Sequence, residues 1–154
     1  KHIELSNIVD GVVIPIEECI DDLFSRKVLG DGILIEPIHG LVVAPCDGKI
    51  TMIYPTKHAI GMKIEEGIEI LIHFGINTVA LNGEGFELLV HQDQVIQKGD
   101  LLWNADLTYI KENALDDKIA LIFTQIPEHY LIDKHYGQLK IGEPIITLKT
   151  KGDK

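Results

Sequence analysis

Hydrophobic residues along this chain recur mostly at every second position or in short β-branched runs, a pattern typical of strands rather than helices. Turn-forming pairs such as Asp-Gly, Gly-Asp and Asn-Gly separate these segments at close intervals. The pattern predicts an all-β fold, an antiparallel β-sandwich or barrel in which helix is a minor component. The predicted strands include residues 12–16, 33–35, 41–43, 50–54, 68–72, 119–123 and 145–148.

Two segments have the features of short helices, Glu17–Ser25 and Asp106–Asn113. Asp106 would act as the N-cap of the second, because a short acidic side chain accepts hydrogen bonds from the unpaired N–H groups of the first turn. No linker rich in Gly, Ser or Pro divides the chain. We therefore expect one domain over residues 1–149 and a polar C-terminal tail over residues 150–154.

Two pairs of segments resemble each other within the chain. Asp10–Ile16 is similar to Asp47–Ile53, and Gln97–Leu102 is similar to Lys140–Ile145. A duplicated strand-turn-strand unit would explain both pairs. The alternative is that Asp-Gly and Gly-Asp turns recur in any β protein, and the sequence leaves both explanations open.

The net charge indicates which classes of molecule can bind to the protein. The 154 residues include 14 Lys and Arg against 24 Asp and Glu, a formal net charge of −10. Such a surface repels nucleic-acid phosphates and anionic lipid heads, and it favours the approach of a basic protein.

Cysteine usage and hydropathy indicate a soluble protein of a reducing cytoplasm. Cys19 and Cys46 stand 27 positions apart without a Cys-x-x-Cys pair, so neither a zinc site nor a disulfide framework is indicated. No apolar run approaches the roughly 20 residues of a membrane helix, and the first residues lack a signal-peptide pattern.

The candidate chemistry rests on two histidines. Alternation over Glu69–Phe74 places Ile70, Ile72 and Phe74 on one face of a strand and His73 on the other. A histidine in a strand is more often structural than functional, so this position alone indicates little.

Thr56 lies two positions before His58, hence on the same side of an extended segment. A hydroxyl that holds one imidazole nitrogen fixes the tautomer and leaves the other nitrogen to react. For the other histidines a surface position is the better interpretation: His2, His39, His91, His129 and His135.

Other motifs are weak. The sequence contains no His-Glu-x-x-His motif, and Gly30–Gly32 and Gly83–Gly85 lack the other residues of a phosphate-binding loop. Lys63 follows a Met, as in a biotin acceptor, but the turn residues Glu65–Gly67 come after it and place it within a strand.

The run Glu69–Phe86 closely resembles the active-histidine signature of the glucose-type enzyme IIA family of the bacterial sugar phosphotransferase system. The resemblance covers nearly the whole chain and weakens after Leu107. Segments similar to the family follow in the same order at residues 28–37, 43–50, 55–61 and 95–100.

The resemblance implies an antiparallel β-sandwich with single helical turns at most. It implies that His73 is phosphorylated through Nε2, that His58 steadies the phosphoryl group and that Thr56 orients His58. The implied donor is the histidine-phosphorylated carrier HPr, the implied acceptor is a cysteine of an enzyme IIB domain of a sugar permease, and no cofactor is implied.

In the family the docking face is an apolar ring with acidic margins. Two positions depart from the family's pattern: Asn77 replaces the usual Asp, and Asp22 replaces an apolar residue. The residues that match docking positions are Asp21, Leu23, Phe24, Tyr54, Leu71, Asn77 and Val79.

We expect no intrinsic metal, because His58 and His73 supply only half of a tetrahedral zinc shell, which a partner's carboxylate would have to extend. Three alternatives remain open. They are a lipoyl- or biotinyl-type carrier modified on Lys63, a zinc peptidase of related β architecture, and a regulatory binding domain without phosphotransfer.

Overall fold

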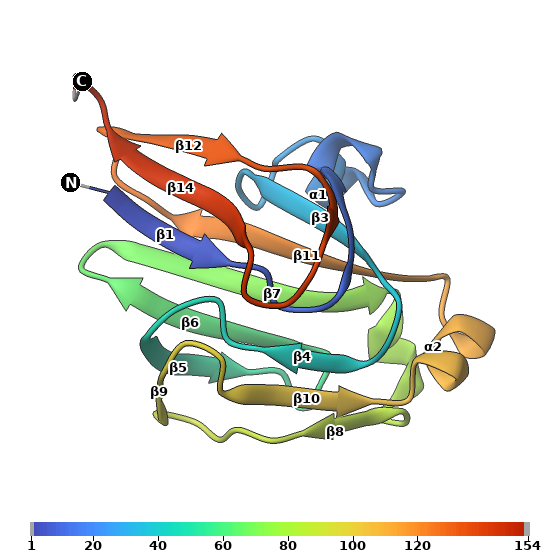
Figure 1. The fold of residues 1–154 in the computed structure, drawn as a ribbon. Helices are drawn as coiled ribbons and strands as arrows, with labels where there is room; N and C mark the ends of the chain where they lie inside the picture. Colours follow the sequence, from blue (N-terminus) through green and yellow to red (C-terminus); the bar gives the residue numbers. More distant parts are fainter. Residues whose placement is uncertain (1, 153–154) are drawn as a thin grey trace.

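In the computed structural model, which describes residues 2–152, the chain folds into antiparallel sheets with few helical turns (Figure 1). The helical segments are η1 (Ile16–Glu18), α1 (Asp22–Ser25), η2 (Thr78–Leu81) and α2 (Leu107–Asn113). The strands are β1 (His2–Ser6), β2 (Gly11–Pro15), β3 (Gly32–Pro37), β4 (Leu41–Val43), β5 (Gly48–Ile53), β6 (Ala59–Glu65), β7 (Ile68–Ile76), β8 (Phe86–Leu88), β9 (Val95–Ile96), β10 (Leu101–Ala105), β11 (Asp116–Gln125), β12 (Tyr130–Lys134), β13 (Gly137–Leu139) and β14 (Pro144–Thr150).

The largest sheet has eight strands in the order β13-β2-β3-β11-β7-β6-β5-β9, and two three-stranded sheets, β1-β14-β12 and β4-β10-β8, complete the fold. All strand pairs are antiparallel. The main core contains side chains of all three sheets, which together enclose it. The expected β-sandwich is confirmed.

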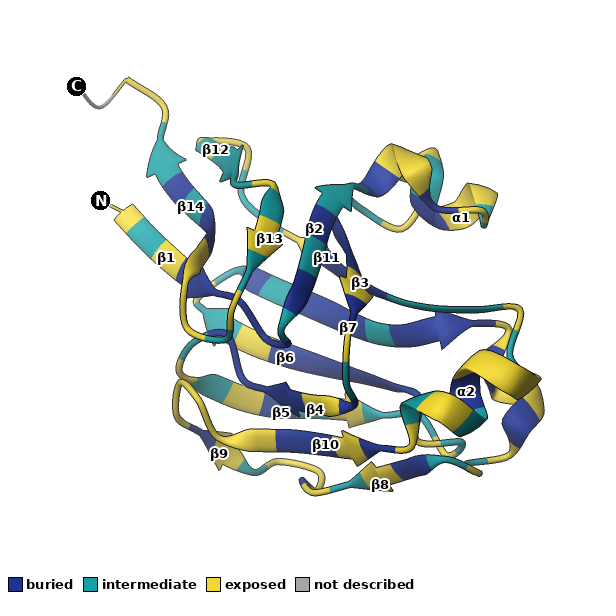
Figure 2. Ribbon diagram, turned by 45° about the vertical axis from the view of Figure 1, so that its right-hand side comes forward, coloured by how far each residue is buried: buried dark blue, intermediate teal, exposed yellow. Residues whose placement is uncertain are grey.

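β7 lies in the interior of the large sheet, and residues on both of its faces are buried. Ile70, Ile72 and Phe74 point into the main core, as the alternation predicted. Leu71 on the opposite face is also buried, in a second and smaller apolar cluster that η1 and α1 help to form. Figure 2 shows the buried residues along β7 and β11 and the exposed surface of α1. The face that carries His73 is therefore partly covered.

The internal duplication is supported by contacts that occur twice. Asp10 Oδ1 accepts a hydrogen bond from the backbone N–H of Ile141 at 2.7 Å, and Asp47 Oδ1 accepts one from Lys98 at 2.8 Å. The pairing of β2 with β13 repeats that of β5 with β9 at equivalent positions of the two units. Recurring turns alone do not predict such matching tertiary contacts.

The two predicted helices differ in outcome. The segment at Asp106 is confirmed as α2, where Asp106 accepts a hydrogen bond from the Tyr109 N–H at 3.1 Å. Its seven residues form about two turns, so the expectation of single turns at most is wrong here. Glu17–Ser25 is not one helix, because Cys19 has extended backbone and Asp21 caps a new helix by accepting from Leu23 N–H.

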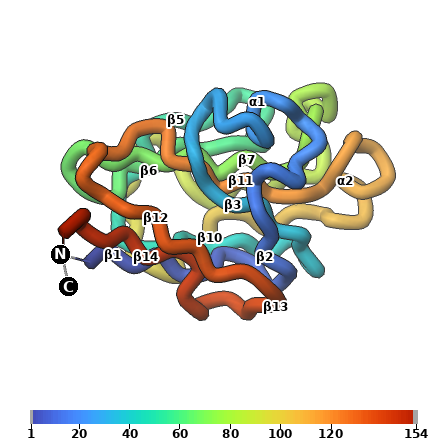
Figure 3. The backbone as a smooth tube through the Cα atoms, turned by 90° about the horizontal axis from the view of Figure 1, so that it is seen from above, coloured from blue at the N-terminus to red at the C-terminus, as the bar shows by residue number. Residues whose placement is uncertain are grey.

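The C-terminal strand is slightly longer than expected. β14 includes Thr150, opposite Tyr130 of β12, one residue beyond the expected domain end at 149, and residues 153–154 lie outside the described chain. His2 of β1 lies opposite Lys149 of β14, so the first and last strands are neighbours, as Figure 3 shows. No helix within residues 2–152 is long and apolar enough to cross a membrane.

Candidate functional site

The two candidate histidines are brought together by the adjacent strands β6 and β7. His58 ends the loop between β5 and β6, which is closed by a hydrogen bond from Tyr54 N–H to Ala59 O at 3.0 Å. Its carbonyl accepts from the Phe74 N–H at 2.7 Å, and Ala59 lies directly opposite His73. Backbone pairing thus places both imidazoles on the same face of the large sheet.

The imidazole rings of His58 and His73 contact each other edge to face. Their centroids are 4.8 Å apart and their planes are inclined by 79°. The role that the resemblance implies for His58, beside a phosphoryl group on His73, requires the two rings to be neighbours, and the structure places them so.

Each imidazole is held through its Nδ1 atom, and for His58 the partner is the Thr56 hydroxyl, as predicted. Thr56 Oγ1 lies 2.8 Å from His58 Nδ1, and His73 Nδ1 lies 2.8 Å from the carbonyl oxygen of Gly75. A carbonyl oxygen only accepts, so Nδ1 of His73 carries the proton of this hydrogen bond. In the neutral ring, Nε2 then holds a free lone pair.

The carbonyl of Gly75 is in place because of a backbone conformation that favours glycine. Gly75 has φ of +80°, and a Cβ atom there would lie 2.4 Å from Thr78 Cγ2. Thr78, which sequence analysis missed, is fully buried and donates from Oγ1 to Phe74 O at 2.7 Å. Its place in the signature run Glu69–Phe86 is the signal that could have indicated it.

Aromatic side chains enclose the pair. Phe24 of α1 lies 5.1 Å from the ring of His73, and Tyr54 lies 5.2 Å from His58 and 6.5 Å from His73, measured between centroids. His58 is only 2% exposed, whereas His73 is half-buried and therefore the more accessible of the two.

This environment favours neutral imidazoles. Burial, and then the neighbouring His58, lower the pKa of His73 to about 4, although the Gly75 carbonyl and Asp21 act in the opposite direction. Burial also lowers the pKa of His58, against hydrogen bonding to Thr56. At neutral pH both rings are uncharged, and Nε2 of His73 keeps the lone pair that a nitrogen nucleophile needs.

Comparison with known proteins agrees with this geometry. The family "phosphoenolpyruvate-dependent sugar phosphotransferase system, EIIA 1" matches residues 3–129. The chain belongs to this family.

A curated relative, the PTS system glucoside-specific EIICBA component of Staphylococcus carnosus (strain TM300), is 46% identical to this EIIA chain over 138 residues. That match covers 90% of the chain but only 20% of the relative, so the chain spans about one fifth of its length. Among solved structures, the glucose permease IIA from Mycoplasma capricolum is 35% identical, with a TM-score of 0.91 and 96% of each chain covered. The chain is thus an EIIA phosphotransferase component of the sugar phosphotransferase system.

The expected docking residues of the EIIA domain differ in accessibility. Leu23 and Val79 are 50% and 53% exposed, and Asn77 is exposed with a left-handed φ of 59°. Asp21 is half-buried, as is Tyr54. Phe24 and Leu71 are buried, so they support this face rather than present themselves to a partner.

A hollow next to Tyr54, which contacts both histidine rings, was not predicted from the sequence. Met52 of β5 is 45% exposed and lines a hollow of about 380 Å³ together with Tyr54, Leu71 and Glu69. From β5, Met52 points toward solvent on this side of the sheet. The apolar surface around Tyr54 therefore extends beyond the positions that match the family.

The remaining histidines have surroundings of their own. His39 lies 3.1 Å from Asp10, His135 lies 3.3 Å from Thr147, and His91 lies 3.1 Å from the carbonyl of Gln92. The ring of His129 lies 4.4 Å from that of Tyr130 at an interplanar angle of 37°, and His2 is exposed on β1.

The alternative chemistries find little support. Lys63 is exposed within β6, as predicted, and pairs with Glu66 at 3.3 Å. Across residues 2–152, no three His, Cys, Asp or Glu side chains are grouped closely enough to hold a metal ion. Cys19 and Cys46 are free thiols, and burial raises the pKa of Cys46 to about 12.

Proposed function

We propose that this EIIA domain accepts a phosphoryl group from phospho-HPr on His73 and passes it to a cysteine of an enzyme IIB domain during sugar uptake. The reaction takes place in the cytoplasm. The observation that carries the proposal is the hydrogen bond from His73 Nδ1 to the Gly75 carbonyl, which leaves Nε2 as the free nucleophile beside His58.

In the first step, the lone pair of His73 Nε2 attacks phosphorus as the P–N bond to the donor imidazole breaks. In the second, a cysteine thiolate attacks the same phosphorus and the bond to His73 Nε2 breaks, so His73 returns to its neutral form. Phosphoryl transfer depends mainly on positioning and on stabilising the charge spread over the equatorial oxygens.

His58 supplies the charge stabilisation in this mechanism. The phosphoryl group brings roughly −1.5 to −2 charges, which raises the pKa of a nearby imidazole. The lowered pKa of His58 in the free domain thus rises when His73 is loaded. A hydrogen bond from His58 Nε2–H to a phosphoryl oxygen then strengthens as charge develops.

Partner docking uses the face around the histidines. Exposed Leu23 and Val79 provide apolar contact, and Asp21 provides an acidic margin for a basic partner. Asn77 removes one negative charge from this margin relative to the family's usual Asp, so affinity for a basic partner is weaker here.

The proposal is tested by two half-reactions. Phosphoenolpyruvate, enzyme I and HPr should label the wild-type protein at His73, as determined by phosphosite mapping, and His73→Ala should not be labelled. His58→Gln keeps a hydrogen-bond donor but cannot become cationic. It should accept phosphate at His73 and pass it to enzyme IIB about 10²-fold more slowly.

Three results would contradict the proposal. Onward transfer from His58→Gln at the wild-type rate would remove His58 from the mechanism. A wild-type protein that binds HPr but is never labelled would instead indicate the regulatory binding domain, and a mass increase on Lys63 would indicate the cofactor-carrier alternative.

A further inference from the structure

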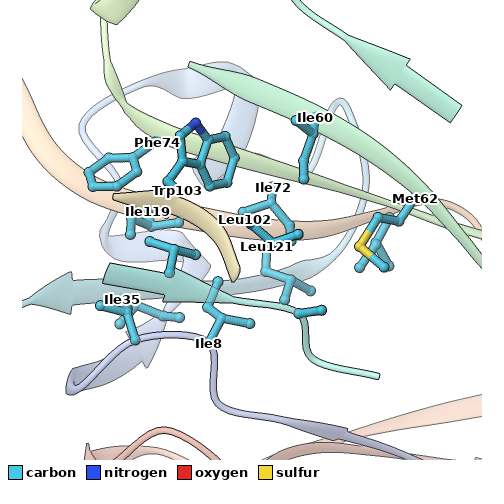
Figure 4. Close-up of a cluster of buried hydrophobic side chains, with 14 of the residues drawn as sticks. Ile8, Ile35, Ile60, Met62, Ile72, Phe74, Leu102, Trp103, Ile119 and Leu121 are labelled. Carbon is cyan, nitrogen blue, oxygen red and sulfur yellow. The ribbon is translucent and has the colours of Figure 1, made fainter. Parts of the chain in front are cut away.

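The only tryptophan of the chain, Trp103, is fully buried in the main core on β10. Its indole is surrounded by apolar side chains such as Phe74, as Figure 4 shows. An indole N–H loses its water partner on burial, so it is stable in the core only if a hydrogen-bond acceptor replaces water. The acceptor that it meets lies in the histidine-bearing loop.

Trp103 Nε1–H donates to the backbone carbonyl of Lys57 at 2.7 Å. Lys57 stands between Thr56 and His58, and it has a left-handed φ of 63°, a conformation that non-glycine residues rarely adopt. Its N–H donates to Tyr54 O at 2.8 Å. Both backbone polar groups of Lys57 are thus engaged, one within the loop and one by the core.

The same indole also touches the other histidine segment. Its ring lies 5.9 Å from that of Phe74 at an interplanar angle of 84°. Phe74 follows His73 directly, and its N–H donates to the carbonyl of His58 at 2.7 Å. On the core side, Trp103 is therefore in contact with both segments that carry the reactive pair.

Trp103 is held by strands of a different sheet from the histidines. It lies opposite Val42 of β4 and Leu88 of β8, in the sheet β4-β10-β8, whereas β6 and β7 belong to the large sheet. The hydrogen bond to Lys57 thus fixes the histidine-bearing loop against the opposite layer of the sandwich. Backbone hydrogen bonds within the large sheet do not supply this constraint.

We propose that Trp103 is a positioning residue for phosphoryl transfer: its indole N–H holds Lys57 in the left-handed conformation that directs Thr56 and His58 toward His73. This inference rests on the proposed function and adds a residue that touches neither the phosphoryl group nor a partner. Removal of the indole N–H leaves the hydrogen bond between His73 and Gly75 intact. It allows the loop segment with Thr56 and His58 to move, so the hydrogen bond between these two residues is weakened.

The test compares Trp103→Phe, which keeps an aromatic ring but removes the N–H, with Phe123→Leu. Phe123 is a buried aromatic of the same core on β11, opposite Ile70 rather than His73. We expect Trp103→Phe to accept phosphate on His73 within about twofold of wild type and to pass it to enzyme IIB about fivefold more slowly. Phe123→Leu should retain wild-type rates in both half-reactions.

A second readout needs no partner protein. In ¹⁵N NMR spectra of the unphosphorylated domain, the ring nitrogens of His58 should shift in Trp103→Phe but not in Phe123→Leu, because only the first variant changes its hydrogen bond to Thr56. If Trp103→Phe is poorly folded, benzothienylalanine at position 103 replaces the N–H with sulfur in a ring of nearly the same shape. It should reproduce the same shifts.

The inference is overturned if Trp103→Phe has wild-type His58 resonances and onward transfer, or if Phe123→Leu shows the same changes. These outcomes are distinct from failure of the proposed function. If the wild-type protein is never labelled at His73, the phosphocarrier proposal fails, and the His58 resonances still decide whether Trp103 positions the loop.

Discussion

The two histidines differ in the group that each Nδ1 meets, a carbonyl for His73 and a hydroxyl for His58. The Gly75 carbonyl accepts only, so the tautomer of His73 is fixed. The Thr56 hydroxyl either donates or accepts, so His58 can exchange tautomers without losing its partner. In the proposed mechanism, a nucleophile with a fixed tautomer lies beside a donor that can change its tautomer, and this pair suits both the unphosphorylated and the phosphorylated site.

The pKa of His73 makes stability depend on pH. In the unfolded chain its pKa is about 6.5, but it is lowered to about 4 in the fold. Between these values the unfolded state binds the extra proton, so the free energy of unfolding falls as pH falls. We expect a loss of about 1 to 2 kcal/mol from His73 between pH 7.5 and pH 5.

Urea unfolding of wild type and His73→Gln at both pH values measures this contribution. The variant lacks the titrating group but keeps the other ionisable residues, so it should lose less stability over the interval. Equal losses in the two proteins would show that His73 is not protonated on unfolding in this range.

Substitution of Gly75 should affect structure and chemistry together. An alanine Cβ would lie 2.4 Å from Thr78 Cγ2 and 2.9 Å from Asp116 O, at a φ of +80°. We expect Gly75→Ala to lower the free energy of unfolding by about 2 kcal/mol or more and to reduce phosphate acceptance at His73. Gly99→Ala is the matched control, since Gly99 has a φ of +87° but nothing within 4 Å of the added Cβ.

If Gly75→Ala and Gly99→Ala lose equal stability and retain equal labelling, then the carbonyl of Gly75 does not position His73. Phosphosite labelling and chemical denaturation of the same two preparations provide the comparison.

Among the elements, strands with an apolar run or alternation of their own were predictable, including the three-residue β4, predicted at residues 41–43. The predicted segments at residues 68–72 and 119–123 lie within β7 and β11, where burial on one or both faces imposes a clear pattern. β8 and β9 have three and two residues, too few to show a period. The break at Cys19 was also missed, because it depends on where Phe24 packs.

The Thr56–His58 bond joins residues two positions apart, so spacing along the loop indicated it. His73 was indicated by the resemblance of its segment to the family signature and not by its place in the strand. The contact from Trp103 to Lys57 spans 46 positions and joins two sheets, so no local pattern indicates it.

The N-cap of α2 provides a stability test that is separate from the chemistry. Asp106→Ala removes the acceptor of the Tyr109 N–H, and we expect the free energy of unfolding to fall by about 1 kcal/mol. Asp106→Ser restores a capping oxygen and should recover most of the loss. Phosphate acceptance should be unchanged in both variants, and a large loss of acceptance would link α2 to the site.

For the whole molecule, the net charge of −10 should control the rate of encounter with a basic donor. We expect phosphoryl transfer from phospho-HPr to slow as salt is raised, because screening shortens the range of attraction. Asn77→Asp adds a charge at the docking face, and it should raise the low-salt rate about twofold and steepen the salt dependence.

Glu87→Gln on β8 is the control, because β8 belongs to the sheet β4-β10-β8 and not to the large sheet that carries the histidines. Quenched-flow measurements of the rate of His73 labelling at low and high salt should show different salt dependences for the two variants. Identical salt dependence in Asn77→Asp and wild type would show that position 77 lies outside the encounter surface.

The first and last strands, β1 and β14, are neighbours, so the order of segments along the chain can be changed without changing the fold. His2 and Lys149 are paired in one small sheet, and Figure 1 shows the start of β1 and the end of β14 at the same edge of the molecule, apart from α1. A short peptide could therefore join the ends, and new ends could be opened at an exposed turn such as Gln92–Asp93. Such a circular permutant would retain the same histidine pair, because the order of segments along the chain would change while their neighbours in space would not.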